Sequence, residues 1–161
     1  PRAATLRAIE IAREGGAIIS CDPNLRMPLW PSEDKAREIL RLAISRADIV
    51  KISDDEVTFL TGEEDFEAGV KQLWCDHWKP QWSGFAEPFR VTSVDATGAG
   101  DGFTAGFLSR LLKNGDLLSS AEQIGAACRF ANAVGALTAT KRGAINALPM
   151  EKEVLAFMAA A

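Results

Sequence analysis

The stretch Asp-Ala-Thr-Gly-Ala-Gly-Asp occupies residues 95–101, between a predicted strand (residues 89–94) and a predicted helix that ends near Asn114-Gly115. Its small central residues leave backbone N–H groups unshielded where the helix begins, and the helix dipole adds about half a positive charge there. Such a turn can hold an anion. Asp101 would repel a passively bound anion, but it suits a base that takes a proton from an attacking hydroxyl group.

Other interpretations of this turn compete with a catalytic one. Its glycines could simply let the helix pack closely on a sheet, with Asp101 as a first-turn acidic residue favoured by the helix dipole. The dinucleotide-binding fingerprint, which an NAD-linked oxidoreductase would carry, requires glycine where Phe103 stands, and a P-loop requires a Gly-Lys-Ser/Thr run that the sequence lacks. The residues alone therefore leave the packing role and the catalytic role open.

Apolar runs alternate with amphipathic helices along most of the sequence. Strands are predicted over residues 17–21 and 48–53, and this alternation indicates an α/β layered fold with a mainly parallel sheet. The Trp-rich segment, residues 74–82, has no clean period and receives no assignment. The predicted helices cover residues 6–14, a segment capped by Ser32, residues 53–62, residues 66–74, the segment after the glycine-rich turn, and a last long helix that starts at Ser119 or Ser120.

Composition narrows the classes of partner. The chain has 161 residues, of which 47% are hydrophobic, so one domain is the default. A net charge of −4 without a basic block argues against nucleic acid and a membrane surface, and favours a small-molecule partner. Three widely spaced cysteines without a CxxC pair indicate neither a disulfide framework nor a zinc site, so we expect a reducing, cytoplasmic compartment.

The sequence at residues 95–103, DATGAGDGF, resembles the D-T-x-G-A-G-D-x-F signature of the pfkB-type, or ribokinase-like, carbohydrate kinases. Residues 21–32 resemble the D-P-N-x-R-x-x-L-W segment of the fructokinases in that family, and residues 51–62 resemble their K-x-S-x-x-E-x-x-x-L-T-G segment. Residues 129–133 and 141–144 resemble the adenine-side helix and the terminal loop. The resemblance implies a three-layer ribokinase-like α/β fold and ATP-dependent phosphorylation of a sugar, with fructose as the expected substrate.

The resemblance also implies roles for the residues of the turn. Asp101 would be the general base on the primary hydroxyl of the sugar. The backbone amides of Gly98, Ala99 and Gly100 would stabilise the charge that develops on the transferred phosphoryl group.

Metal and nucleotide contacts follow from the same resemblance. Glu56 matches the acidic residue that organises Mg²⁺ and phosphate in relatives, although a capping box with Ser53 is an equally good interpretation. Asp95, the carbonyl of Thr97 and the loop at Gly143 match the relatives' site for a monovalent cation, which implies K⁺ as a further ion.

Two polar side chains have open alternatives. Asn132 would lie along the adenine ring of ATP, or else face solvent as a mid-helix asparagine can. Arg26 would meet phosphate or sugar, or else be a solvated surface arginine.

The sequence also departs from the family pattern. An N-terminal half with most sugar contacts, a β-sheet lid used for dimer contacts, and a V-T-x-G-x-x-G turn expected between Trp74 and Ser83 are absent. We therefore expect residues 1–161 to be the C-terminal part of one kinase domain, inactive alone, from a reading frame that extends upstream of Pro1. A homodimer is expected only for the complete protein, and a catalytically inactive homologue with a binding or regulatory role is the alternative.

Overall fold

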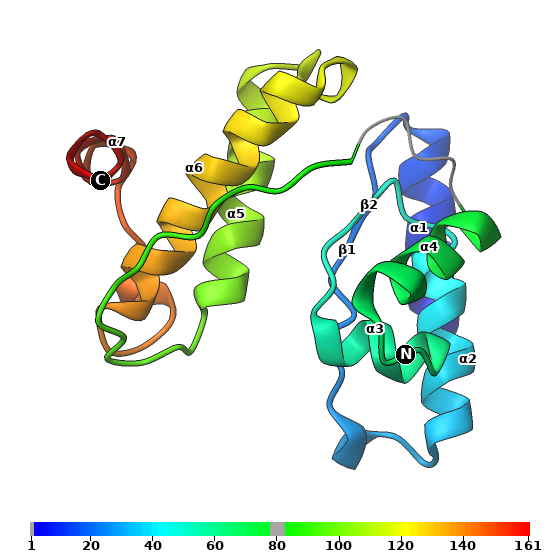
Figure 1. Ribbon diagram of the computed structural model, residues 1–161. Coiled ribbons are helices and arrows are strands. Elements are labelled where there is room, and N and C mark those ends of the chain that lie inside the picture. Colours follow the sequence, from blue (N-terminus) through cyan, green and yellow to red (C-terminus); the bar gives the residue numbers. More distant parts are fainter. Residues whose placement is uncertain (1, 78–82) are drawn as a thin grey trace. The chain divides into compact units, whose positions relative to one another are not determined.

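The computed structural model describes residues 2–77 and 83–161, and the chain divides into two compact units within residues 1–80 and 81–161 (Figure 1). Most of the Trp-rich segment that the sequence leaves unassigned, residues 78–82, lies outside the described residues.

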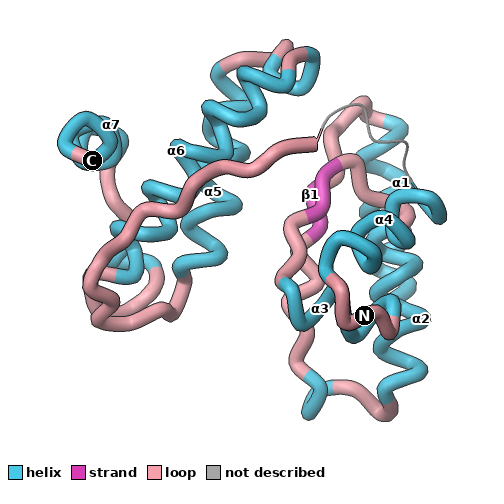
Figure 2. The backbone as a smooth tube through the Cα atoms, in the orientation of Figure 1, coloured by secondary structure: helices cyan, strands magenta, loops and turns pink. Residues whose placement is uncertain are grey.

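The first unit combines a short parallel β-ladder with helices. Strands β1 (Ser20–Cys21) and β2 (Ile49–Val50) run parallel, with Ser20 opposite Ile49 and Cys21 opposite Val50. Figure 2 shows how little of the backbone is strand and how much is helix. The two predicted parallel strands are confirmed in place and direction, although both are shorter than predicted. The other elements are α1 (Arg2–Glu14), η1 (Met27–Leu29), α2 (Glu33–Ile44), α3 (Asp54–Thr61) and α4 (Phe66–His77).

Capping residues set the ends of these helices where the sequence predicts them. The Ser32 hydroxyl accepts the N–H of Lys35 at the start of α2 (3.2 Å). Glu56 accepts the N–H of Ser53 at the start of α3 (3.0 Å), and Gly62 ends that helix with φ of 79°. Local hydrogen-bonding chemistry therefore fixes these boundaries.

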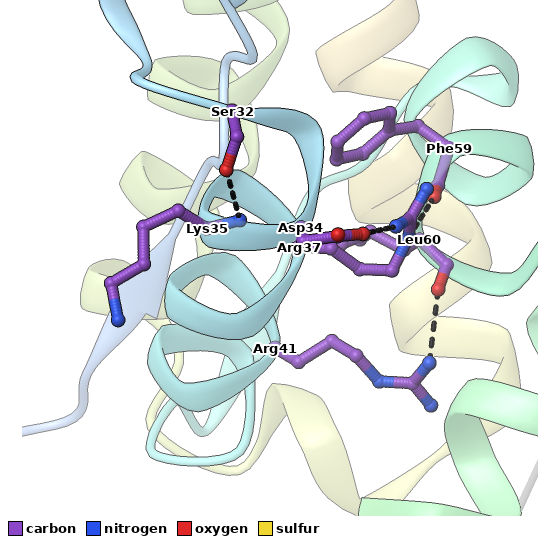
Figure 3. Close-up of polar contacts among 7 residues, drawn as sticks. All are labelled: Ser32, Asp34, Lys35, Arg37, Arg41, Phe59 and Leu60. Atoms are coloured by element: carbon purple, nitrogen blue, oxygen red, sulfur yellow. Dashed lines mark hydrogen bonds and ion pairs between the residues drawn. The ribbon is translucent and has the colours of Figure 1, made fainter.

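Helices α2 and α3 are joined by a hydrophobic core and by two arginines. The core contains Leu40, Ile44, Val57, Leu60 and Leu73. In addition, Arg37 donates to the carbonyl of Phe59 (3.0 Å) and Arg41 donates to the carbonyl of Leu60 (2.9 Å), as Figure 3 shows. These donors satisfy carbonyls at the end of α3 that have no partner within that helix.

The second unit begins with an extended segment rather than a strand. The predicted strand over residues 89–94 is wrong, because this segment lies over α6 without pairing to any strand in the described part of the chain. Its apolar character reflects packing of side chains instead: the ring of Phe89 lies 5.0 Å from that of Phe157. The N–H groups of Val94 and Asp95 both donate to the carbonyl of Ala139 (2.8 and 3.1 Å), and this contact ends the segment.

Two long helices pack closely in the second unit. They are α5 (Ala99–Lys113) and α6 (Ala121–Ala139), and both were predicted from the sequence. Small residues line their contact, and a Cβ at Gly135 would lie 2.9 Å from the carbonyl oxygen of Ala99. A Cβ at Gly106 would lie 3.0 Å from the Cα of Ala131. The helices can approach this closely only because these positions carry no side chain.

Helix α7 (Glu151–Ala160) was not predicted from the sequence, so the helix predicted as the last one is followed by another. Its signal was present: Glu153 accepts the N–H of Met150 (2.7 Å), which forms half of a capping box ahead of the buried Val154. Glu151 pairs with Arg110 and Lys113 of α5 (3.0 and 2.6 Å). The short elements η2 (Leu117–Ser119) and η3 (Ile145–Ala147) connect these helices.

We predict opposite effects for two glycine-to-alanine changes on α6. Gly135→Ala places a methyl group 2.9 Å from the Ala99 carbonyl, so it should lower the free energy of unfolding by about 1–3 kcal/mol. Gly125→Ala meets no atom within 4 Å and should raise that free energy by about 0.5–1 kcal/mol. Urea denaturation of both variants checks this, and equal stability of the two would contradict the packing argument.

Candidate functional site

The glycine-rich turn of the second unit requires a glycine at residue 98. Gly98 is the N-cap of α5 with φ of 80°, a conformation that L-residues with side chains rarely adopt. A Cβ there would also lie 2.7 Å from the Cβ of Ala144. The absence of a side chain therefore lets the start of α5 touch the loop that follows α6.

Asp95 connects the same two segments by hydrogen bonds. One carboxylate oxygen accepts the N–H of Thr97 (2.9 Å) and the other accepts the N–H of Gly143 (3.0 Å). Hydrogen bonds from the Thr97 side chain, the Gly143 amide and the Thr97 amide lower the pKa of Asp95 to about 2. The structure thus brings together the three residues that the sequence predicts for a monovalent cation.

The first turn of α5 presents backbone donors together with an acid. Gly102 donates the first helical hydrogen bond, to the carbonyl of Gly98 (2.8 Å), and Ala99 donates to Ala96 (3.1 Å). Within the described part of the chain, the N–H groups of Gly100 and Asp101 have no backbone acceptor. Of the three expected donors, the amides of Gly98 and Gly100 are available to an anion, whereas the Ala99 amide is already engaged. The amide of Asp101 is a further available donor. The side chain of Asp101 is exposed in the same turn.

A cavity of about 320 Å³ adjoins the start of α5. Asn132 on α6 lines it, and its side-chain amide donates to the carbonyls of Ala86 and Glu87 (3.0 and 3.2 Å). Neither alternative weighed for Asn132 included this role of holding the extended segment. The remaining lining is mostly apolar, which suits a flat organic ring: Pro88, Phe89, Ala99, Phe103, Gly135, Ala136 and Ala139.

The first unit holds Glu56, the other predicted metal-site residue. Its carboxylate is buried, with 7% of the residue exposed, and its two oxygens accept the N–H groups of Leu25 (2.7 Å) and Ser53 (3.0 Å). Glu56 thus connects the loops that follow β1 and β2. Arg26 lies in the first of these loops, where it is exposed and donates to the carbonyl of Leu25 (2.9 Å).

Sequence reasoning missed an ion pair at the carboxyl ends of the two strands. Asp22 follows β1 and Lys51 follows β2, and their charged groups lie 3.3 Å apart. The second oxygen of Asp22 is buried without a hydrogen-bond partner in the described structure. The carboxyl ends of parallel strands are the usual ligand-binding edge of an α/β sheet. This rule places polar residues such as Asp22 at the end of the first strand, and applied to the second strand it also points to Lys51.

The carboxylates of Glu56 and Asp95 are the donors that could contact a metal ion. Glu56 belongs to the first unit and Asp95 to the second, and no cluster of three or more potential ligands occurs among residues 2–77 and 83–161. All four carboxylate oxygens accept backbone N–H groups, but each retains a lone pair, so contact with a metal ion or its bound water fits the donors present.

The model of the pfkB carbohydrate kinase family matches residues 73–151. Putative fructokinase-8 of Arabidopsis thaliana is 39% identical over 173 residues, which cover 98% of this chain and 82% of that protein. This chain belongs to the pfkB family of carbohydrate kinases. Probable fructokinase-2 of the same plant is 40% identical, and its match covers 98% of this chain but 53% of the relative. The chain therefore spans about half the length of most curated relatives that it matches.

A solved structure of the family confirms the expected ribokinase-like fold. Fructokinase from Vibrio cholerae O395, solved with fructose, ADP and a calcium ion bound, superposes with a TM-score of 0.89 at 33% identity. That match covers 97% of this chain and 55% of the enzyme. No helix in the part of the pfkB-family chain that the structure describes is long and apolar enough to cross a membrane.

We predict a pH dependence of stability that arises from Asp95. Because its pKa falls to about 2 in the folded chain, its contribution is complete above the unfolded pKa of 3.8 and is lost as the pH drops toward 2. Thermal melts of the chain and of Asp95→Asn should therefore differ most above about pH 5 and converge toward pH 2. A difference in melting temperature that stays constant over this range would contradict the assignment.

We further predict that Glu56→Gln destabilises the chain without any metal present. One backbone N–H would face an amide NH₂ group instead of an acceptor, at a cost of about 1–3 kcal/mol. Denaturation in EDTA measures this, with the exposed Glu63→Gln as the control. A variant as stable as the control would mean that Glu56 does not hold the two loops.

Proposed function

We propose that this chain is part of an ATP-dependent fructokinase, which transfers the γ-phosphoryl group of ATP to fructose and yields fructose 6-phosphate. The observation that carries the proposal is the first turn of α5, where unpaired backbone N–H groups and the exposed carboxylate of Asp101 lie together. Family membership and the similarity to fructokinases support the same reaction. Because the chain spans half of its relatives, the proposal concerns a protein that also carries their other half.

The transfer uses the two kinds of group in this turn. The sugar hydroxyl oxygen attacks the γ-phosphorus while its proton passes to the carboxylate of Asp101. The bond between the γ-phosphorus and the bridging oxygen breaks, and ADP leaves with the electron pair. The N–H groups of Gly98, Gly100 and Asp101 stabilise the charge on the transferred group, and the dipole of α5 adds to their field. Ala99 joins them only if its bond to Ala96 opens.

Other residues position the nucleotide and the ions. We assign the adenine ring to the cavity lined by Asn132, which adjoins the start of α5. The Asp95 carboxylate, the Thr97 carbonyl and the loop at Gly143 would hold K⁺, which would fix the loop against the turn. Glu56 would contact Mg²⁺ through water. Bound Mg²⁺ would neutralise charge on the phosphates.

The alternative is a catalytically inactive homologue that acts as a binding or regulatory protein. The observation that favours it is the missing V-T-x-G-x-x-G turn. In addition, no strand precedes the glycine-rich turn in the described part of the second unit. The proposal includes a cytoplasmic location, and a homodimer only for the extended protein.

We predict that Asp101→Asn lowers kcat by about 10²–10⁴-fold in a chain extended to the length of its relatives, with a small change in the KM for ATP. The amide keeps the shape of the side chain and leaves the backbone donors in place, but it cannot accept the hydroxyl proton. Steady-state rates with fructose and ATP measure the effect, and the 161-residue chain should be inactive with either residue.

Thermal melts provide the control for this prediction. If Asp101 only balanced the helix dipole, the change would cost under about 1 kcal/mol of stability and leave kcat intact. A full-rate Asp101→Asn enzyme would therefore overturn the catalytic assignment. Phosphorylation of ribose but not of fructose would overturn the choice of sugar and leave the kinase assignment standing.

A further inference from the structure

A second cavity of the C-terminal unit, of about 460 Å³, is lined by Arg90 and Arg129 beside the rings of Phe89 and Phe157. We propose that it binds a small phosphate ester of about the size of a sugar phosphate, at a site separate from the glycine-rich turn. This inference does not rest on kinase activity, because the turn and Asp101 take no part in it.

The charge of the cavity favours an anion. Two guanidinium groups line it and no acidic side chain does. Neither arginine forms an ion pair within the described part of the chain, whereas Arg110, which also lies on a ring in this unit, is paired with Glu151 at 3.0 Å. Guanidinium groups present several donors in one plane and bind phosphate oxygens in pairs.

The C-terminal end of α7 also lines the cavity, and its negative charge opposes the positive charge of the arginines. Helix carbonyls there carry about half a negative charge, and the terminal carboxylate of Ala161 in the 161-residue chain adds one more, but the two guanidinium charges together exceed this sum. The last turn of α7 has no basic residue of its own. An excess of positive charge therefore remains for a ligand.

Aromatic contacts hold one arginine in place. The Arg129 guanidinium lies 4.9 Å from the centre of the Phe89 ring, and that ring lies 5.0 Å from the Phe157 ring. Such contacts reduce the rotamer freedom that Arg129 would lose when it binds a ligand. The neighbouring rings and the methyl groups of Ala160 and Ala161 offer apolar contact to an organic body. Because of these contacts, we favour a phosphate ester over inorganic phosphate.

The size of the cavity agrees with this choice. A volume of about 460 Å³ falls within the range of small-molecule sites, roughly 300–1,000 Å³, and exceeds what inorganic phosphate fills. The cavity shares Pro88 and Phe89 with the cavity lined by Asn132, so the two adjoin each other along the extended segment.

Isothermal titration calorimetry on the 161-residue chain tests the proposal with three probes: fructose 6-phosphate, inorganic phosphate and fructose. We expect fructose 6-phosphate to bind more tightly than inorganic phosphate, and fructose not to bind. Arg129→Gln and Arg90→Gln should each weaken the binding of fructose 6-phosphate by about tenfold, the loss of one charge-assisted contact. The control Arg7→Gln, at an exposed position on α1, should bind as the unchanged chain does.

Three results would overturn the proposal. The first is that fructose 6-phosphate does not bind the unchanged chain, and the second is that it binds both glutamine variants as tightly as the unchanged chain, which would place its phosphate elsewhere. Equal affinity for inorganic phosphate would exclude the organic body. Arg129→Lys is the control for misfolding of the glutamine variant. Lysine keeps the positive charge but lacks the paired donors of arginine, so the affinity of Arg129→Lys for fructose 6-phosphate should fall between those of the unchanged chain and Arg129→Gln.

Discussion

The close approach of α5 and α6 is the constraint on which the second unit depends. It is possible because Gly106 and Gly135 carry no side chain at the contact, where added methyl groups would meet backbone atoms. The contact with Gly135 occurs at Ala99, the first residue of α5, so the packing of the helices also sets the position of the glycine-rich turn. The donors and the acid of the candidate site therefore owe their placement to side chains that are absent.

Hydrogen bonds of Asp95 also fix the position of the glycine-rich turn. They tie the turn to a loop 48 residues later in the chain, and Gly98 leaves the room for that contact. In the first unit, Glu56 likewise connects two loops, because its two carboxylate oxygens accept hydrogen bonds from the loops after β1 and β2. In both units a carboxylate that the sequence assigns to metal binding is also a structural connector between loops, and the two roles are compatible.

Local signals in the sequence predicted local structure well. Ser32, Ser53 with Glu56, and Gly62 bound helices as expected, because capping depends on neighbours a few residues away. Features that depend on distant partners were harder to predict. Residues 89–94 have the composition of a strand but find no strand to pair with in the described structure. The pairing of Asp95 with Gly143 could be suggested only by resemblance to a family, and the pairing of Asn132 with Ala86 and Glu87 could not be predicted at all.

The way the extended segment ends has a consequence for the evolution of this chain. The Ala139 carbonyl accepts the N–H groups of both Val94 and Asp95, so the backbone is anchored immediately before the glycine-rich turn. Insertions and deletions ahead of Ala86, where Asn132 begins to hold the segment, change the length of a surface connection without displacing the turn. Length changes after the anchor would move Asp95 away from Gly143. Variation in length among homologues should therefore accumulate before Ala86, where this chain already departs from the family pattern, and be rare from there to Asp101.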